Sequence, residues 1–464
     1  MPPKHDPAGG TGAETRTTTT ASMSTTASEA AEAYFPDHGD PRYRVQSYEL
    51  DLRYRPAGNR LSATARLTAV AADAAAPLRE FALDLAAFRV ERVTVDGTPA
   101  KFTHRGGKLR VRPTTAPQPG SAFSAVVRYS GTPRPVHSEW GALGWEELSD
   151  GALVASQPIG APSWYPCNDR PDDKASYRIT VTVPAGYMVV ANGTLVTHEV
   201  AASTTKWVYE QPAPTASYLA TVQIGRYTRT RLTANPVPQN AAYPARLRER
   251  FTHDFARQPQ MMELFEELFG PYPFAEYAVV VVDEELDVPV EAQGLSTFGT
   301  NHVDGRRGSE RLVAHELAHQ WFGNSLTVAD WRHIWLNEGF AKYAEWLWSE
   351  RCGDGAASAA DLAAESHAQL RSLPQTLRLA DPGMRKMFDD RLYRRGALVL
   401  HALRRTLGDG PFFVMLKQWA AEHRHGVVST SQFIQHANRY SVYGLDDLFT
   451  AWLEEKTLPP LPNG

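Results

Sequence analysis

The chain has 464 residues, 42% hydrophobic and 22% charged, and its net charge of −4 leaves no basic excess for nucleic acid or a membrane surface. No apolar run approaches the ~20 residues that span a bilayer, the N-terminus lacks the apolar stretch of a secretory signal, and two cysteines, Cys167 and Cys352, give no disulfide framework. We therefore expect a cytoplasmic protein of about two or three domains, with no nucleic-acid or membrane partner.

Residues 1–33 are rich in Thr, Ser, Ala and Gly. They carry too little apolar surface to offset the entropy of ordering them, which predicts a disordered tail. From Tyr43 the sequence changes, because YRVQSYELDLRYRP alternates apolar and polar residues like a half-buried strand. Similar short runs, broken by Gly and Pro, continue to about Tyr227, which is typical of an antiparallel sandwich or saddle. We predict a β domain over residues 34–231.

The second half of the chain, residues 232–464, reads differently. Met262, Leu264, Phe265 and Leu268 form the apolar face of an amphipathic helix, and a Gly-Pro turn leads from it into the short buried strand AVVVV. Most of the chain after Ser309 has helical spacing. A β domain followed by a largely helical domain predicts an α+β multidomain protein.

The segment RLVAHELAHQWFGN contains His315, Glu316 and His319 in the order H-E-x-x-H. Residues four apart on a helix share a face, so the two imidazoles can bind one metal ion, while Glu316 points into the same cleft. Zn²⁺ is the usual ion of such a pair, and a catalytic zinc needs a third protein ligand and one open position.

A third ligand is available in DWRHIWLNEGFAKYAEWLW, a second helical segment that carries Glu338. Glu345 follows two turns later on the same face and can fix the tautomer of a ligand histidine. A chance H-E-x-x-H match on a helix with two surface histidines is the alternative, expected roughly a few per cent of the time. The helical context, Glu338 and the aromatic-rich surroundings favour a metal site.

HELAHQWFGN followed by WLNEGFAKYAE resembles the zinc aminopeptidases of the gluzincin group, which includes the membrane alanyl aminopeptidases and the leukotriene epoxide hydrolase. The resemblance extends from about Tyr43 to Leu461. It implies an N-terminal antiparallel β domain and a thermolysin-like zinc metallopeptidase domain with a helical C-terminal lobe. It also implies one Zn²⁺ per chain, in a short form that lacks the family's C-terminal helical-repeat domain.

The same resemblance implies substrate-binding residues. Gln157, in SQPIGAPSWYPCND, matches a glutamine that helps to hold the free α-amino group of a substrate. Glu291 and Gly294 match the glutamate and last glycine of the family's Gly-Ala-Met-Glu-Asn-x-Gly. Pro289 and Ala292 depart from that motif. Because Pro289 has no N–H and Ala292 has no amide side chain, recognition of the substrate main chain is altered.

Tyr393 matches the tyrosine of the family's Tyr-x-Lys-Gly motif, which hydrogen-bonds the developing oxyanion, although Arg395 replaces the lysine. A packed helix tyrosine, a loop glutamine and a solvated carboxylate are the alternatives for Tyr393, Gln157 and Glu291. We predict a monomeric zinc aminopeptidase that acts on peptides with a free N-terminus, with Glu316 as the general base.

Two other functions stay open from the sequence. Endopeptidase or epoxide hydrolase activity on the same scaffold is credible because of the altered segment Val288 to Gly294. A binding module without chemistry is less favoured, because the predicted ligands and Glu316 are all present. The sequence does not reveal the preferred N-terminal residue or the physiological substrate.

Overall fold

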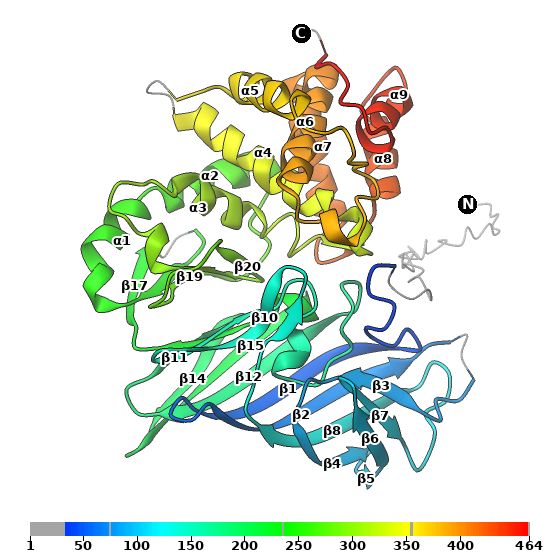
Figure 1. The fold of residues 1–464 in the computed structure, drawn as a ribbon, viewed down its shortest axis with the longest axis vertical. Helices are drawn as coiled ribbons and strands as arrows, with labels where there is room; N and C mark the ends of the chain where they lie inside the picture. Colours follow the sequence, from blue (N-terminus) through cyan, green and yellow to red (C-terminus); the bar gives the residue numbers. More distant parts are fainter. Residues whose placement is uncertain (1–32, 74–75, 234–235, 353–355, 463–464) are drawn as a thin grey trace, which may run out of the picture.

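The structure, a computed structural model, describes residues 33–73, 76–233, 236–352 and 356–462. The predicted disordered tail, residues 1–33, lies outside the described residues except for Ala33. Figure 1 shows a β-rich part at the bottom and a largely helical part above it, with the C-terminus at the top. This arrangement confirms the predicted α+β class, with the β region first.

The base of the β-rich part is an eight-stranded sheet with the order β14-β15-β12-β1-β2-β8-β4-β5. Neighbouring strands run antiparallel except β1 and β12, which are parallel. Its strands are β1 (Tyr43–Arg55), β2 (Arg60–Ala71), β4 (Arg89–Val95), β5 (Thr98–Pro99), β8 (Ala122–Gly131), β12 (Lys174–Pro184), β14 (Thr194–Val200) and β15 (Thr204–Ala216).

Two smaller sheets complete the β-rich part, with the orders β13-β16-β11-β10-β9 and β3-β7-β6. Alternation explains the packing, because Leu50 and Leu52 of β1 are buried in a core shared by the three sheets, whereas Asp51 between them is exposed. The strands are β3 (Phe81–Asp84), β6 (Lys101–Arg105), β7 (Lys108–Arg112), β9 (Val136–Ser138), β10 (Gly141–Leu148), β11 (Gly151–Ala155), β13 (Met188–Ala191) and β16 (Val222–Gly225).

The second part begins with a five-stranded sheet of order β17-β18-β19-β21-β20, in which β20 is an edge strand. Its strands are β17 (Thr228–Thr233), β18 (Gln239–Tyr243), β19 (Tyr277–Val281), β20 (Val290–Ala292) and β21 (Leu295–Phe298). Because β17 begins before residue 232, the division into residues 34–231 and 232–464 stays a prediction.

Helices form the remainder of this part and share one large aromatic core. They are α1 (Arg248–Asp254), α2 (Gln258–Phe269), α3 (Glu310–Ala318), α4 (Trp335–Cys352), α5 (Ala359–Arg371), α6 (Asp390–Leu407), α7 (Asp409–Glu422), α8 (Thr430–Asn438) and α9 (Asp446–Phe449). A short parallel pair, β22 (Thr327–Val328) and β23 (Val427–Val428), joins the loop after α3 to the loop before α8. Within the described ranges, no helix is long and apolar enough to cross a membrane.

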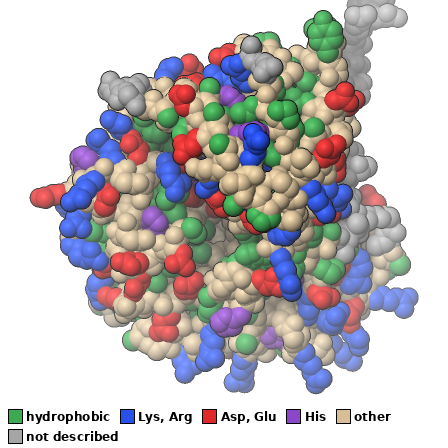
Figure 2. Space-filling model, turned by 45° about the horizontal axis from the view of Figure 1, so that its top comes forward, with side chains coloured by type: hydrophobic (Ala, Val, Ile, Leu, Met, Phe, Trp, Pro, Cys, Tyr) green, Lys and Arg blue, Asp and Glu red, His purple; other side chains and the backbone are tan. Residues whose placement is uncertain are grey.

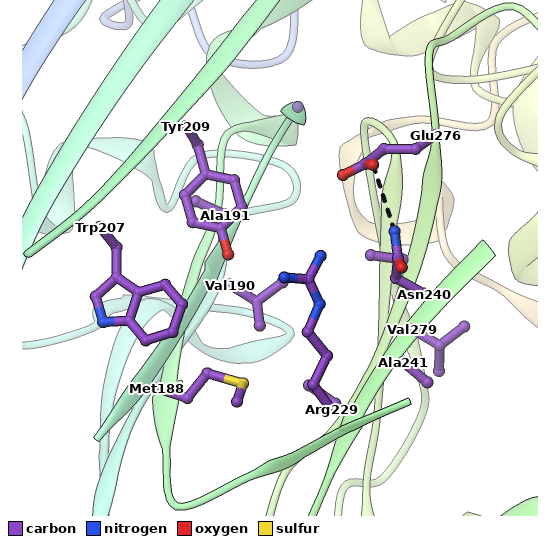
Figure 3. A pocket seen from close by; sticks show the side chains of 13 residues that line it. Met188, Val190, Ala191, Trp207, Tyr209, Arg229, Asn240, Ala241, Glu276 and Val279 are labelled. Atoms are coloured by element: carbon purple, nitrogen blue, oxygen red, sulfur yellow. Dashed lines mark hydrogen bonds between the residues drawn. The ribbon is translucent and has the colours of Figure 1, made fainter. Parts of the chain in front are cut away.

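The seam between the two parts is closely packed. Figure 3 shows a small pocket there, into which Arg229 of β17 extends between Tyr209 of β15 and Asn240 of β18. The pocket offers about 20 Å³, room for roughly one water molecule, so it is too small for a peptide. Figure 2 shows a hollow elsewhere between the two parts, with acidic and basic side chains interspersed over the same face.

Helices α4 and α6 approach each other at two glycines. A Cβ at Gly396 would lie 2.7 Å from the Cα of Gly339, and a Cβ at Gly339 would lie 2.8 Å from the Cα of Gly396. Only glycine at both positions permits this backbone contact. The contact brings the first turn of α6, with Tyr393, against the first turn of α4, with Glu338.

We expect Gly396→Ala to lower the free energy of unfolding by about 1–3 kcal/mol, because the added methyl group meets backbone atoms that cannot rotate away. Chemical denaturation measures this change. Gly410→Ala in α7 is the matched control, since no atom lies within 4 Å of a Cβ built there. Equal stability of the two variants would contradict the close contact.

Candidate active site

Helices α3 and α4 bring together the three predicted metal ligands. His315 lies on α3, His319 follows one turn later at the end of that helix, and Glu338 lies in the first turn of α4. Oε2 of Glu338 is 3.6 Å from Nε2 of His315 and 3.4 Å from Nε2 of His319. One ligand atom from each residue lies within 4.8 Å of the others. The three residues predicted from the sequence therefore form one compact group in the structure.

The outer nitrogens of the two imidazoles are already engaged. Nδ1 of His315 donates to Oε1 of Glu345 at 2.8 Å, and Nδ1 of His319 donates to the carbonyl of Phe322 at 3.1 Å. Lys342 donates in turn to Oε2 of Glu345 at 2.8 Å. These contacts leave both Nε2 atoms free to face Glu338, and they place Glu345 in the position predicted for it.

Electrostatics in the group favour a cation. Burial opposes the charge of His319, but the carboxylates of Glu291 and Glu338 outweigh it and raise the pKa of His319 to about 10. Burial opposes ionisation of Glu338 too, yet the two imidazoles lower the pKa of its carboxyl to about 2. The negative potential that holds protons on the imidazoles is the same potential that would hold a divalent ion.

Glu316 is the one acid of the group with an unsatisfied atom. The residue is 3% exposed, and its Oε2 has no hydrogen-bond partner among the described residues. Burial raises the pKa of Glu316 to about 8, against the opposing charge of His315. Oε2 of Glu316 is therefore available to form a hydrogen bond with water or with a bound ligand.

The donor set fits Zn²⁺. Two imidazole nitrogens and one carboxylate oxygen are the ligands of many catalytic zinc sites, where the fourth position is left for water or substrate. Within the part of the chain that the structure describes, this is the only group of three such residues that could hold a metal ion.

The predicted amine-binding pair also comes together. Gln157 lies after β11 in the β-rich part, and its Nε2 donates to Oε1 of Glu291, on edge strand β20, at 2.7 Å. Glu291 is 7% exposed, and its charge acts on His319 and Glu316. Burial raises the pKa of Glu291. A carboxylate and an amide oxygen side by side can accept hydrogen bonds from an ammonium group.

Gly294 closes the turn after β20 with a φ of +73°, which glycine adopts without strain. Two residues of the segment that carries H-E-x-x-H, for which the sequence predicted no role, hold this turn. Gln320 accepts from the N–H of Gly294 at 2.8 Å and donates to the carbonyl of Ala292, which Asn324 also approaches at 2.9 Å. Gln320 directly follows His319 and Asn324 ends the same motif segment, so their place in that segment was the signal that could have identified them.

Tyr393 lies beside the metal group, its ring stacked on that of His315 with centroids 6.2 Å apart. Burial raises the pKa of Tyr393 well above its usual value, so its hydroxyl keeps the proton at neutral pH. Arg395 serves another part of the fold. Its guanidinium donates to the carbonyls of Trp452 at 2.9 Å and Lys456 at 2.8 Å, fastening the C-terminal residues to α6.

Comparison with known families decides the relationship. The Peptidase M1 N-terminal domain matches residues 45–219, and the Peptidase family M1 domain matches residues 253–452. The chain belongs to peptidase family M1. The predicted membership of the gluzincin aminopeptidase group is thereby confirmed, as is the two-part architecture.

A solved M1 zinc metallopeptidase from Deinococcus radiodurans is similar over 93% of this chain and 99% of its own, with 31% identity and a TM-score of 0.84. A mutant of that enzyme has been solved with a Tyr-Ser-Ala substrate. Aminopeptidase M1-D of Oryza sativa subsp. japonica is 25% identical over 90% of this chain. The chain spans about half the length of that relative, 51%. Yeast LTA4 hydrolase shares the fold, with a TM-score of 0.77 at 20% identity.

In this M1 chain we expect Glu345→Gln to weaken zinc binding about 10- to 100-fold, because the amide cannot hold the His315 ring as the carboxylate does. Competition with a graded series of chelators measures the change. Glu350→Gln, on the same helix but bonded to Arg404, is the control. Unchanged zinc affinity in Glu345→Gln would contradict the role given to Glu345.

Proposed function

We propose that this chain is a zinc-dependent aminopeptidase that removes N-terminal residues from peptides. The observation that carries the proposal is the buried Glu291 carboxylate, paired with Gln157 and close enough to act on His319. A buried acid at that place would bind the α-ammonium group of a peptide and so set the cut one residue in. The aminopeptidases among its M1 relatives support the same activity.

In this proposal His315, His319 and Glu338 hold the zinc. When bound, zinc polarises the scissile carbonyl and lowers the pKa of a water molecule. The charge of a bound cation would lower the pKa of Glu316, so that its carboxylate can accept a proton from the attacking water and pass that proton to the leaving amine. The Tyr393 hydroxyl, protonated at neutral pH, donates to the carbonyl oxygen as negative charge develops there.

We propose the following substrates, location and oligomeric state. Peptides with a free N-terminus are the proposed substrates, and Gly294 shapes the turn beside their amine. A cytoplasmic location draws support from the cysteine content, because two cysteines in 464 residues provide no disulfide framework. We retain a monomer as the proposed oligomeric state.

Glu316→Gln is the direct test of the chemistry. We expect zinc to stay bound, because Glu316 is not among the three ligands, while kcat falls about 10²- to 10⁴-fold through loss of the proton acceptor. Hydrolysis of aminoacyl fluorogenic amides and metal analysis measure the two quantities. Glu310→Gln, in the first turn of the same helix, is the control. Near-normal turnover in Glu316→Gln would refute the assignment.

Glu291→Gln tests the choice of an exopeptidase. Loss of the charge-assisted contact should raise KM for a free aminoacyl amide about 10- to 100-fold and change cleavage of blocked substrates little. Parallel assays with free and N-acetylated amides measure the difference.

Pro289 offers no N–H to a substrate, which is the feature that favours an endopeptidase instead. Equal cleavage of free and acetylated substrates by the unmodified protein would support that alternative.

A further inference from the structure

The turn Ala292–Gln293–Gly294 follows Glu291 directly and is held from both parts of the molecule. On its helical side, Gln320 and Asn324 fasten the Ala292 carbonyl and the Gly294 N–H. Its other side faces the β-rich part, where Gln293 makes the contacts. Gln293 is 0% exposed, so it touches neither solvent nor substrate.

The side chain of Gln293 is anchored at the end of β15. Its Nε2 donates to the carbonyl of Ala213 at 3.1 Å, the carbonyl of Pro214 at 3.2 Å and the hydroxyl of Thr215 at 2.6 Å. These three acceptors converge on one amide group. A two-hydrogen donor shared among three acceptors fixes the position of the amide within the β-rich part.

The backbone of Gln293 is tied to the same part. Its N–H donates to the carbonyl of Leu219 at 3.3 Å, and its carbonyl accepts from Nδ2 of Asn192 at 2.9 Å. Asn192 also donates to the carbonyl of Leu219 at 2.8 Å, which joins the two backbone contacts into one network. One residue of the helical part is thus held through its side chain, its N–H and its carbonyl by the β-rich part.

This network lies two residues from one half of the amine-binding pair. Gln157 comes from the β-rich part and Glu291 from edge strand β20. Their 2.7 Å hydrogen bond therefore persists only while the two parts keep their relative position. Position 292 is alanine and offers no side-chain hydrogen bond of its own. Gln293 is therefore the side chain nearest to Glu291 that bonds across the seam on this turn.

We propose that Gln293 is a positioning residue that sets amine selectivity, by locking the strand that carries Glu291 to the part that carries Gln157. The inference rests on the proposed aminopeptidase function. It predicts that breaking the link lets Glu291 drift from Gln157 while the metal group, held within α3 and α4, stays intact. A merely structural role would lower stability and leave amine selectivity unchanged.

The test compares two metal-binding probes on the zinc-loaded full chain, leucine hydroxamate and its des-amino analogue 4-methylpentanohydroxamate. The ratio of their dissociation constants reports recognition of the amine alone, independently of turnover. Gln293→Met keeps the side-chain volume and removes the donor. In this variant we expect leucine hydroxamate to lose about tenfold in affinity relative to 4-methylpentanohydroxamate, with zinc content unchanged.

Gln258→Met is the matched control. Gln258 is also 0% exposed, and its Nε2 donates to Oε1 of Gln239 at 2.9 Å. As in Gln293, its Oε1 has no hydrogen-bond partner among the described residues. It lies on α2, so its loss should reduce stability and leave the probe ratio unchanged. A ratio shifted equally in both variants would overturn the proposal.

Thr215→Val is a milder second variant that keeps the test decisive if Gln293→Met does not fold. It removes one acceptor of the Gln293 amide, and we expect it to shift the ratio about threefold. In the double variant, Gln293→Met with Thr215→Val, the ratio should equal that of Gln293→Met alone, because both changes break the same hydrogen bond. An unchanged ratio in both variants would overturn the positioning role even if the protein hydrolyses peptides. If the unmodified protein hydrolyses no peptide and the ratio still shifts, the proposed function fails and the positioning role of Gln293 stands.

Discussion

The site depends on a buried excess of carboxylates around two buried imidazoles. Four glutamates, Glu291, Glu316, Glu338 and Glu345, are each less than 8% exposed and lie about the ring pair of His315 and His319. Removing so many acidic groups from water is costly unless positive charge compensates them. A divalent ion held by His315, His319 and Glu338 would supply that compensation and would couple metal binding to the stability of this region.

Helix α4, which carries Glu338, is packed closely against α6. Gly339 and Gly396 let α4 and α6 touch, which fixes Tyr393 relative to Glu338. Arg395, two residues after Tyr393, fastens the same helix to the C-terminal residues through backbone carbonyls. Tyr393 and Glu338 therefore lie on two helices that are packed backbone against backbone.

Local patterns carried much of this information in the sequence. The α+β class followed from strand alternation and helical spacing. The spacing of His315 and His319, and of Glu338 and Glu345, indicated which side chains share a helix face, and the search for a third zinc ligand pointed to Glu338. What could not be foreseen were contacts whose partners lie far away in the chain. Nothing near Gln293 indicates that Thr215 accepts its hydrogen bond, and nothing near Gly396 indicates the approach of Gly339. Such pairings depend on how the finished sheets and helices dock, which no local pattern encodes.

The two halves of the site differ in where their support comes from. The metal ligands and Glu345 are held inside α3 and α4, whereas Gln157 and the network around Gln293 belong to the seam. Catalytic power and amine selectivity can therefore vary separately, because a substitution on the β-rich side reaches the amine end without touching the metal group. In the proposed function, docking of the two parts thus completes the substrate site as well as burying apolar surface, because Gln157 and Glu291 come from opposite sides of the seam.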